Sequence, residues 1–376
     1  MVSVVRRRDE EPRASSLLEE LEELVQNLGI EVIGSSLARA RKTYPTYLLG
    51  KGKMEEIIAL AEAAECDVIV FDNELTPGQQ RNWEEASKVL VIDRHEVILD
   101  VFAERARTRE AVLQVELARL EYSLPRLRRA WTHLGRQRGG GGVTQRGEGE
   151  AQIELDQRMV RDKIATTKRE LEQVIRHRTV SRKRRSRVPV PTASIVGYTN
   201  AGKSTLFNKL VHGNVRAEDI PFSTLDPITR RVTLPSGAHA LLTDTVGFIQ
   251  KLPPALIAAF RATLEELQEA TLLLHVVDIS HPNAGEQNLV VEETLKKLGL
   301  ESKPRLLVLN KADLVMDADG ERQDSMPLTA QSQAKGVLVS AAQDWGTREL
   351  LQEVEDALSS QSESGTPRAS TVRFVG

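Results

Sequence analysis

Hydrophobic positions in the first hundred residues alternate between helical spacing and short continuous runs. A helix ending near Gly29 is predicted by leucines and valine spaced three or four apart, at Leu17, Leu18, Leu21, Leu24, Val25 and Leu28. Strands are predicted over 30–33, 45–49, 67–71 and 89–92, and helices over 54–65 and after the capping box at 76–79. The alternation predicts a small α/β domain with a mostly parallel sheet over residues 17–103, preceded by a flexible tail at 1–16.

From residue 104 the pattern becomes two long stretches, each with a narrow apolar stripe. The first runs from Ala106 to Leu127 and the second from Ile153 to Val174, at three-to-four spacing. Two helices packed against each other require such stripes. We therefore expect an antiparallel helical hairpin over 104–187, in which Pro125 kinks or ends the first helix.

The last predicted domain, residues 188–359, contains apolar runs that read as buried strands. They lie at 193–196, 240–243, 272–278, 305–309 and 337–339. Residues 360–376 are short of apolar positions and read as a C-terminal tail. Polar motifs follow most of these strands, and the order of these motifs indicates what the domain binds.

The first of these motifs is GYTNAGKST, residues 197–205, between a strand and a helix start. Its glycines let the backbone wrap a phosphate chain so that successive N–H groups point at it. Lys203 would reach the β- and γ-phosphates, and the Ser204 hydroxyl would ligate Mg²⁺. Taken alone, the spacing also fits an ordinary strand-turn-helix.

Two further segments are placed to sense a γ-phosphate. In Phe222–Pro227, Thr224 would ligate the metal through its hydroxyl and meet the phosphate through its N–H. Asp244, at the end of a strand, would hold the Mg²⁺ shell through water, and the Gly247 N–H would meet the γ-phosphate.

A base-recognition motif, Asn310–Asp313, follows the strand at 305–309. The Asp313 carboxylate would accept two hydrogen bonds from guanine, which adenine cannot offer. Lys311 would lie along the base, Asn310 would tie the loops together, and Ser340–Ala342 would form the last base-contacting loop. Four motifs in this order predict a GTP-binding module.

The sequence assigns the following residues to this site. GTP binding is predicted for Gly197, Tyr198, Thr199, Asn200, Ala201, Gly202, Lys203, Ser204, Thr205, Phe222, Asp244, Thr245, Val246, Gly247, Asn310, Lys311, Asp313, Ser340, Ala341 and Ala342. Catalysis is predicted for Lys203, Thr224, Gly247 and Asn200, and metal binding for Ser204 and Thr224.

Composition fits a soluble protein with a charged middle. Hydrophobic residues make up 40% of the 376 positions and charged residues 28%. No run of about 18 apolar residues exists, and Cys66 is the only cysteine, so we expect a reducing, cytoplasmic location, with a peripheral place at a membrane as an alternative. Residues 105–187 hold 22 Lys and Arg against 10 Asp and Glu, whereas the rest of the chain holds 29 against 44. This indicates either a surface for a phosphate-rich polymer or a solvated, Arg-rich helical pair.

The predicted hairpin tip, residues 131–149, is rich in arginine and glycine. RNA binding is predicted for the arginines in and beside it, Arg128, Arg129, Arg136, Arg138 and Arg146. Arginine with a nearby ring, here Trp131, and flexible glycines suits irregular RNA; the alternative is a disordered linker. The basic run at 176–187 is equally consistent with a phosphate contact or a solvated linker.

A second Gly/Lys motif, GKGK at 50–53, lies in the N-terminal domain. Its spacing matches no standard nucleotide loop, and a tight turn uses the same glycines. A second nucleotide site and a plain turn are both open readings here.

Together these motifs resemble the HflX GTPases, within the Obg/HflX-like superfamily related to translation factors. The resemblance rests on GYTNAGKST, TLDP, DTVGF, NKAD and SAA behind a GKGK-bearing α/β domain and an Arg/Gly-tipped hairpin, and it covers nearly the whole chain. The expected fold class is α/β: the small N-terminal α/β domain, the hairpin and a Ras-like P-loop GTPase domain with a mixed, mostly parallel sheet. A folded C-terminal extension, present in some relatives, is not expected here.

The resemblance implies an enzyme that hydrolyses GTP to GDP and phosphate and binds the large ribosomal subunit and its RNA. In that family the hairpin loop approaches the peptidyl-transferase region, and the protein splits stalled or hibernating ribosomes, which implies a role in rescue or recycling under stress. We expect a monomer. Two other functions remain open: an ATP-driven RNA remodeller that uses the N-terminal domain, and a GTP-switched protein-binding module without RNA contact.

One departure from Ras-like chemistry is visible after Gly247. Phe248 stands there, and phenylalanine cannot orient a water by a hydrogen bond, so slow intrinsic turnover is expected. Asn200 occupies a position that resembles potassium-binding GTPases, which makes K⁺ a candidate cofactor beside Mg²⁺. Alternatively Asn200 only holds the loop, and the ribosome orders residues 216–226.

Overall fold

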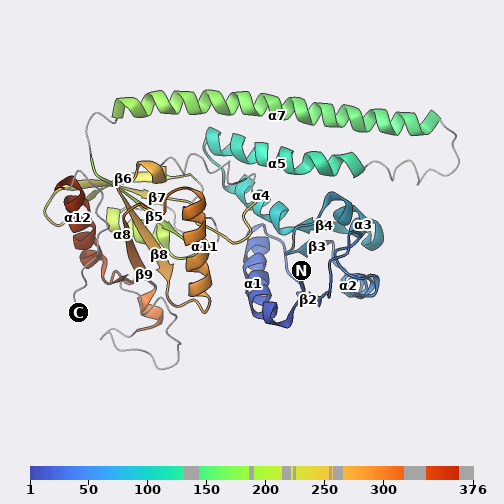
Figure 1. The fold of residues 1–376 in the computed structure, drawn as a ribbon, viewed down its shortest axis with the longest axis horizontal. Coiled ribbons are helices and arrows are strands. Elements are labelled where there is room, and N and C mark those ends of the chain that lie inside the picture. Colours follow the sequence, from blue (N-terminus) through green and yellow to red (C-terminus); the bar gives the residue numbers. More distant parts are fainter. Residues whose placement is uncertain are drawn as a thin grey trace. The chain divides into compact units, whose positions relative to one another are not determined.

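The computed structural model describes residues 1–130, 144–185, 190–213, 222, 226–253, 256, 266–316 and 336–363. The chain forms two compact units (Figure 1), Met1–Thr179 with Pro253–Ala259, and Val180–Leu252 with Phe260–Gly376. In its described residues each unit contains one sheet, and each is described by itself.

The first unit begins with a four-stranded parallel sheet in the order β2-β1-β3-β4. Its strands are β1 (Val2–Val5), β2 (Ser36–Arg39), β3 (Val68–Phe71) and β4 (Leu90–Asp93). The chain moves outward from β1 to β2 and then returns past β1 to β3, so the order reverses between β1 and β3. Right-handed crossovers then require helices on both faces of the sheet.

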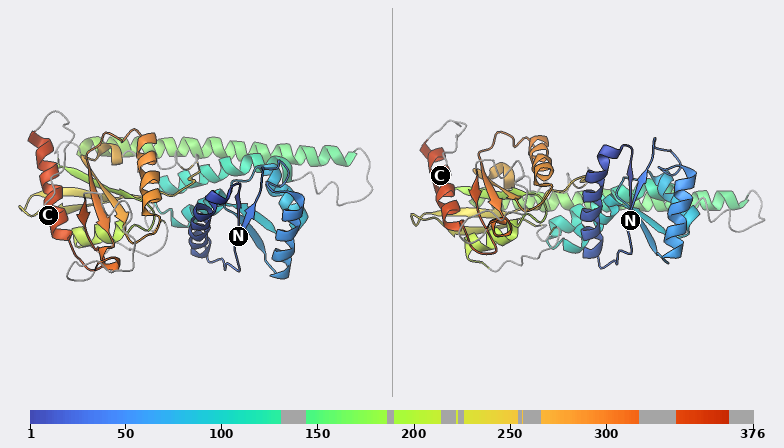
Figure 2. Two further views of the ribbon diagram at one scale, coloured as in Figure 1. Left: turned by 60° about the horizontal axis from the view of Figure 1, so that its bottom comes forward. Right: turned by 90° about the horizontal axis from the view of Figure 1, so that it is seen from below.

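Helices cover both faces of this sheet (Figure 2). Helix α1 (Glu11–Asn27) lies on one side, and α2 (Lys51–Ala63) and α3 (Pro77–Ser87) lie on the other. The apolar stripe of α1 buries Leu21 and Leu24 completely, and Trp83 of α3 packs against Phe71 with ring centroids 4.9 Å apart. Thr76 and Gln79 form the predicted capping box at the start of α3, with proline at the first helical positions.

Three sequence predictions for this region are wrong. Residues 1–16 are no flexible tail, because Val2–Val5 pair with both β2 and β3 and α1 begins at Glu11. The strand predicted at 30–33 instead lies at Ser36–Arg39, in register with β1. The strand predicted at 45–49 is a tight turn, closed by paired backbone hydrogen bonds between Tyr44 and Leu48.

The helical hairpin consists of α5 (Arg109–Ala130) and α7 (Thr144–Arg185), which follow α4 (Arg94–Arg105). Helices α5 and α7 run side by side in opposite directions (Figure 1) and are joined by ion pairs such as Lys163–Glu116 at 2.7 Å and Lys168–Glu121 at 2.8 Å. Pro125 does not end the first helix, which was one of the two expectations, because α5 continues five residues beyond it.

A buried polar cluster fixes α5 to the N-terminal sheet. The Asp93 carboxylate accepts hydrogen bonds from the Tyr122 hydroxyl at 2.8 Å and from Arg126 at 3.4 Å. The Arg126 guanidinium also donates to the Leu75 carbonyl at 2.9 Å and lies 3.4 Å from the centre of the Tyr122 ring. Because these groups are largely removed from water, their pairing defines one orientation of α5 on the sheet.

The second unit contains a six-stranded sheet in the order β10-β9-β8-β5-β7-β6. Its strands are β5 (Thr192–Gly197), β6 (Ile228–Thr233), β7 (His239–Asp244), β8 (Leu272–Asp278), β9 (Arg305–Asn310) and β10 (Val337–Leu338). Only β6 runs antiparallel to its neighbour. The predicted α/β class with a mixed, mostly parallel sheet is confirmed.

Helices α8 (Lys203–Val211), α11 (Ala284–Lys297) and α12 (Thr347–Glu363) pack on this sheet. Every residue of β8 is buried, as expected of a central parallel strand covered on both faces. Helix α12 ends at Glu363, four residues into the C-terminal tail that the sequence predicts at 360–376. Within the described ranges, no helix is both long and apolar enough to cross a bilayer.

Candidate nucleotide site

The predicted motifs of the second unit meet at one edge of its sheet. Because β5, β7, β8, β9 and β10 are parallel, their carboxyl ends lie along the same edge, where ligands bind in open α/β sheets. The loops after β5, β7, β9 and β10 carry the predicted phosphate, metal and base residues. The fold therefore gathers segments that are up to about 140 residues apart in the sequence.

The phosphate loop turns sharply between β5 and α8. Gly202 has φ +84°, and a Cβ on it would lie 2.3 Å from Nδ2 of Asn310, so glycine is required there for both conformation and space. Asn200 is exposed and also left-handed, at φ +59°, a conformation that asparagine tolerates better than most residues. The loop thus turns its backbone outward at the N-terminus of α8, where N–H groups and the helix dipole favour an anion.

Lys203, the first residue of α8, is buried beneath this loop. Its Nζ donates to the Tyr198 carbonyl at 2.6 Å. Burial lowers the pKa of the Lys203 ammonium to about 8, and the nearby Asp244 carboxylate opposes that shift. An ammonium held in such surroundings interacts strongly with any phosphate charge that enters.

Ser204 and Asp244 form the candidate metal position. The Ser204 hydroxyl donates to Oδ2 of Asp244 at 2.6 Å, and both side chains are buried. A hydroxyl and a carboxylate are oxygen donors of the kind Mg²⁺ prefers, so the residues fit this ion. No cluster of three or more His, Cys, Asp or Glu suited to a metal occurs in the described part of the chain, so phosphate oxygens and waters would complete the shell.

The segment after β7 is hydrogen-bonded directly to the phosphate loop. Thr199 N–H donates to the Phe248 carbonyl at 2.8 Å, and Phe248 N–H donates to the Gly197 carbonyl at 3.0 Å. Between these bonds Gly247 lies so close that an added Cβ would be 2.8 Å from Nζ of Lys203 and 2.9 Å from Cα of Thr199. Gly247 is therefore beside the position predicted for the γ-phosphate.

The base end of the site is built around Asn310. Its Nδ2 donates to the Ala201 carbonyl at 2.8 Å, and its Oδ1 accepts from Ala341 N–H at 3.1 Å. This one side chain links the phosphate loop to the loop that contains Ser340, Ala341 and Ala342, as the sequence predicts. Asp313 lies half-buried in the short 3-10 helix Ala312–Leu314 that follows.

The other predicted residues of the site have fewer contacts. Thr205 lies in the first turn of α8, Thr245 donates to the Ile195 carbonyl at 2.5 Å, and Val246 is buried. Phe222 is buried with φ +59°. Thr224 lies outside the described residues, so its predicted metal contact stays a prediction.

Three of the five predicted RNA-binding arginines lie at described ends of the hairpin helices. The backbone positions of Arg128 and Arg129 are in the last turn of α5, and that of Arg146 is in the first turn of α7. Arg136, Arg138 and the glycines at 139–142 lie outside the described residues. The RNA contact stays a prediction.

The GKGK segment of the first unit begins a helix. Gly50 is the N-cap of α2, and Lys51 and Lys53 are paired with Glu55 at 3.6 Å and Glu56 at 2.7 Å on the surface of that helix. Neither glycine has a positive φ. No convergent phosphate cradle of the kind found around Lys203 is visible among these described residues.

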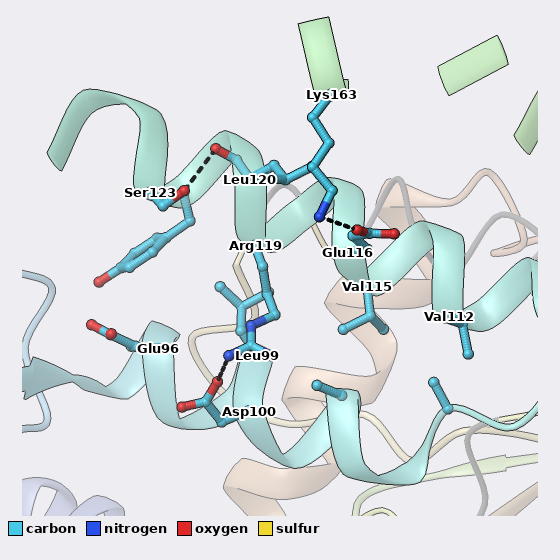
Figure 3. Close-up of a pocket in the computed structure, with 13 residues that line it drawn as sticks. Glu96, Leu99, Asp100, Val112, Val115, Glu116, Arg119, Leu120, Ser123 and Lys163 are labelled. Atoms are coloured by element: carbon cyan, nitrogen blue, oxygen red, sulfur yellow. Dashed lines mark hydrogen bonds and ion pairs between the residues drawn. The ribbon is translucent and has the colours of Figure 1, made fainter. Parts of the chain in front are cut away.

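A groove of about 610 Å³ lies on the first unit between α4 and α5 (Figure 3). Its lining includes the apolar side chains of Leu99, Val115 and Leu120. Its charged lining residues are paired with one another, Arg119 with Asp100 at 2.8 Å and Lys163 with Glu116. None of the residues that the sequence predicts to bind a ligand lines this groove, so the groove is separate from the predicted nucleotide site.

Two contacts at the site are not part of the sequence prediction, although Tyr198 itself is among the predicted GTP-binding residues. Asp278, at the end of β8, binds the Lys311 ammonium at 2.8 Å, and the Tyr198 hydroxyl accepts from Gln250 N–H at 3.1 Å. The sequence contains one signal for the first, an aspartate directly after a buried strand. It contains none for the tyrosine hydroxyl, since its partner is a backbone group 52 residues away.

Comparisons with known proteins agree with this geometry. Three family models match in succession: a GTP-binding GTPase N-terminal region at 15–103, a GTP-binding GTPase middle region at 105–185 and a 50S ribosome-binding GTPase at 192–311. The chain is 47% identical to GTPase HflX of Akkermansia muciniphila over 369 residues, covering 96% of this chain and 84% of that protein.

A second relative and a solved structure extend the comparison. GTPase HflX of Escherichia coli K12 is 42% identical over 351 residues, which cover 93% of this chain and 81% of that protein. The crystal structure of SsGBP with GDP is similar in fold, with a TM-score of 0.50 and 23% identity over 96% of this chain and 99% of that one. From the motifs, the site and these relatives it follows that the chain belongs to the HflX family of GTPases and is a GTP hydrolase.

Proposed function

We propose that this GTPase binds the large ribosomal subunit through its helical hairpin and uses GTP hydrolysis to split ribosomes for rescue or recycling under stress. It would act as a cytoplasmic monomer. The observation that carries the proposal is that one chain contains both the nucleotide site after β5 and the hairpin. The second helix of that hairpin spans 42 residues and is rich in arginine. The match of residues 192–311 to a family described as ribosome-binding supports it.

The hairpin has the charge that an RNA partner requires. Arg158 and Arg169 are exposed on α7, and the five arginines predicted to bind RNA lie in and beside the tip. Lys163 and Lys168 are instead paired with glutamates of α5, so they hold the hairpin together. Neutralising phosphates with such arginines releases counterions and makes binding fall steeply with salt.

At the nucleotide site the chain would stabilise the charge that develops on the γ-phosphate. Ser204 and Thr224, with Asp244 through water, would hold Mg²⁺, which would supply positive charge to offset that of the phosphates. Lys203 would leave the Tyr198 carbonyl and donate to the β- and γ-phosphate oxygens, while N–H groups of the loop and of Gly247 donate to the same charge. Asp313 and Lys311 would select and cover guanine.

Because Phe248 cannot orient water, another group must complete the reaction. We favour K⁺ held in part by the exposed, left-handed Asn200, which would add a positive charge beside the phosphates. The alternative is that the ribosome orders residues 216–226 and positions the water. Comparing turnover in K⁺ and in Na⁺, with and without large subunits, separates the two; equal rates in both salts would eliminate potassium.

The ribosome role is tested by co-sedimentation with large subunits in GDP and in a non-hydrolysable GTP analogue. We expect binding to be stronger with the analogue, because a γ-phosphate would order Thr224 and Gly247. Replacing Arg128, Arg129, Arg136, Arg138 and Arg146 with alanine should abolish it without changing intrinsic GTP hydrolysis.

A matched control replaces two exposed arginines of the second unit, Arg230 and Arg231 on β6, and should retain binding. Unchanged sedimentation of the hairpin variant would refute the proposal. Binding that resists high salt would favour a protein partner for the hairpin instead of RNA.

A further inference from the structure

The side chain of Asp278 lies where the base site meets the centre of the sheet. It is the last residue of β8 and is paired in register with Asn310 of β9. Its side chain is only 9% exposed. A carboxylate that is so nearly buried must be satisfied by nearby donors.

The two oxygens of this carboxylate have separate partners. Oδ1 accepts from the Ser280 N–H at 2.9 Å and from the Ser280 hydroxyl at 2.6 Å, which shapes the turn after β8. Oδ2 accepts only from the Lys311 ammonium, at 2.8 Å, among the contacts of the described residues. Oδ2 therefore contacts the base-recognition motif through Lys311, whereas Oδ1 contacts the turn that follows β8.

Lys311 is held in an unusual conformation. Its φ is +61°, which is uncommon for a residue with a long side chain, and the side chain is 26% exposed. A free lysine stem has many rotamers, and binding a base must order them. The ion pair with Asp278 orders the stem before any nucleotide arrives, which is preorganisation.

Asp313 lies two residues beyond Lys311, in the same turn. Its carboxylate makes no ion pair or side-chain hydrogen bond among the described residues, and Leu314 N–H bonds back to the Lys311 carbonyl at 3.1 Å. A second carboxylate therefore lies two residues along the chain from an ammonium that sits on a flexible four-carbon stem. In the structure Asp278 has the ammonium, and Asp313 keeps its hydrogen-bonding capacity.

We propose that Asp278 is a positioning residue for guanine recognition: it holds the Lys311 ammonium away from Asp313 and so leaves Asp313 available to the base. The inference rests on the assignment of Lys311 and Asp313 to the base site. Without Asp278, Lys311 turns to Asp313, neutralises it and competes with the two guanine donors. Asp278 then acts on specificity without touching the nucleotide.

The test measures binding of GDP and of inosine diphosphate, which lacks the exocyclic amine of guanine. Asp278→Asn keeps an acceptor for Ser280 but removes the charge that holds Lys311. We expect GDP affinity to fall about tenfold and the preference for GDP over inosine diphosphate to shrink several-fold. Asp356→Asn, the same change at an exposed position of α12, should alter neither.

The decisive variant combines Asp278→Asn with Lys311→Met, which keeps the stem and removes the ammonium. The double variant should regain most of the preference for GDP, because nothing remains to occupy Asp313. A purely structural role for Asp278 predicts no such recovery, so failure to recover would overturn the proposal. Unchanged preference in Asp278→Asn alone would also overturn it.

Two further results keep the outcomes apart. If Asp278→Asn alone does not fold, the double variant decides, because it removes Asp278 and the Lys311 ammonium together: it should retain the preference for GDP, and losing it refutes the proposed competition. If the unmodified protein does not prefer GDP to inosine diphosphate, the assignment of Asp313 to the base fails, and the positioning role fails with it.

Discussion

Both units contain a parallel sheet with polar side chains at the carboxyl ends of its strands, but these side chains are used differently. In the first unit the Asp93 carboxylate accepts from four groups: Leu75 N–H, Glu96 N–H, the Tyr122 hydroxyl and Arg126. In the second, Lys203 is bonded to a carbonyl and Asp313 to no side chain among the described residues.

The difference shows that fold position alone does not make a binding site. The Asp93 carboxylate of the first sheet is occupied in attaching α5 to that sheet, whereas the second sheet leaves charged groups whose contacts a nucleotide can replace. The first sheet is therefore a scaffold for the hairpin, and the second is the chemical centre.

The largest expected effect lies at the second sheet. Lys203→Ala removes the buried ammonium nearest the phosphate position, and we expect kcat/KM for GTP to fall on the order of 10²- to 10³-fold. Steady-state phosphate release measures it. Lys209→Ala, later on the same helix, should leave the rate within about twofold, because surface changes away from the site have little effect. Near-normal GTP hydrolysis by the Lys203 variant would contradict the assignment of Lys203 to the phosphates of GTP.

The next effect lies at the first sheet. Asp93→Ala leaves the buried part of Arg126 and two backbone N–H groups without their acceptor, and we expect a loss of about 3 kcal/mol in the local stability of that unit. Hydrogen exchange in β3 and β4 measures it. GTP hydrolysis without ribosomes should not change.

Asp100→Ala is the matched control for that experiment. Asp100 lies on the neighbouring helix, α4, and pairs with Arg119 at a site where the two side chains are 36% and 53% exposed. Exposed pairs contribute little, so its removal should cost less than about 1 kcal/mol. Equal losses in the two variants would contradict the view that burial makes the Asp93 cluster structural.

The second unit is more predictable from the sequence than the first. Its buried parallel strands read as continuous apolar runs, so the sequence predicts β8 at its observed bounds, 272–278. In the first unit β2 reads Ser-Leu-Ala-Arg, which has no clear apolar pattern, and it becomes a strand because β1 lies beside it. Val2–Val5 resemble a loose terminus because the four residues are followed by arginines.

At the site, the sequence predicts residues but not their pairings. Motif spacing places Asn310, Lys311 and Asp313 after one strand. The contact between Asp278 and Lys311 depends on the register of β8 against β9, which joins residues 32 positions apart. Such register is set by packing of the whole sheet, and no local pattern reveals it.

A smaller effect concerns a partly buried carboxyl group of the first unit, Glu96, and depends on pH. Burial, with Asp93 and Asp100 nearby, raises the pKa of Glu96 to about 7 from 4.5. The unfolded chain loses this proton near pH 4.5 while the folded chain keeps it, so stability falls as pH rises from 4.5 to 7 and stays lower above.

Glu96→Gln removes that penalty. We expect it to stabilise the protein by about 1–2 kcal/mol at about pH 8, allowing for partial solvent screening, and to change little at about pH 4. Thermal unfolding at the two pH values measures the difference. Glu104→Gln, exposed on the same helix, should give no pH-dependent gain; a gain of equal size there would show that general charge, not burial of Glu96, is responsible.

The smallest expected effect is that of a change at Gly52, and it tests whether the second Gly/Lys motif acts like the first. Gly52 lies inside α2, where a Cβ added to it would have no atom within 4 Å, so Gly52→Ala should stabilise the protein by about 0.5–1 kcal/mol through helix propensity. Gly202→Ala should instead abolish GDP binding, because the added Cβ would clash with the side chain of Asn310. Binding of GDP and ATP by calorimetry, with thermal unfolding, makes the comparison. If residues 50–53 wrap a phosphate, alanine at position 52 should weaken ATP binding. If they only start a helix, the same change should stabilise the protein and leave the affinities for GDP and ATP unchanged.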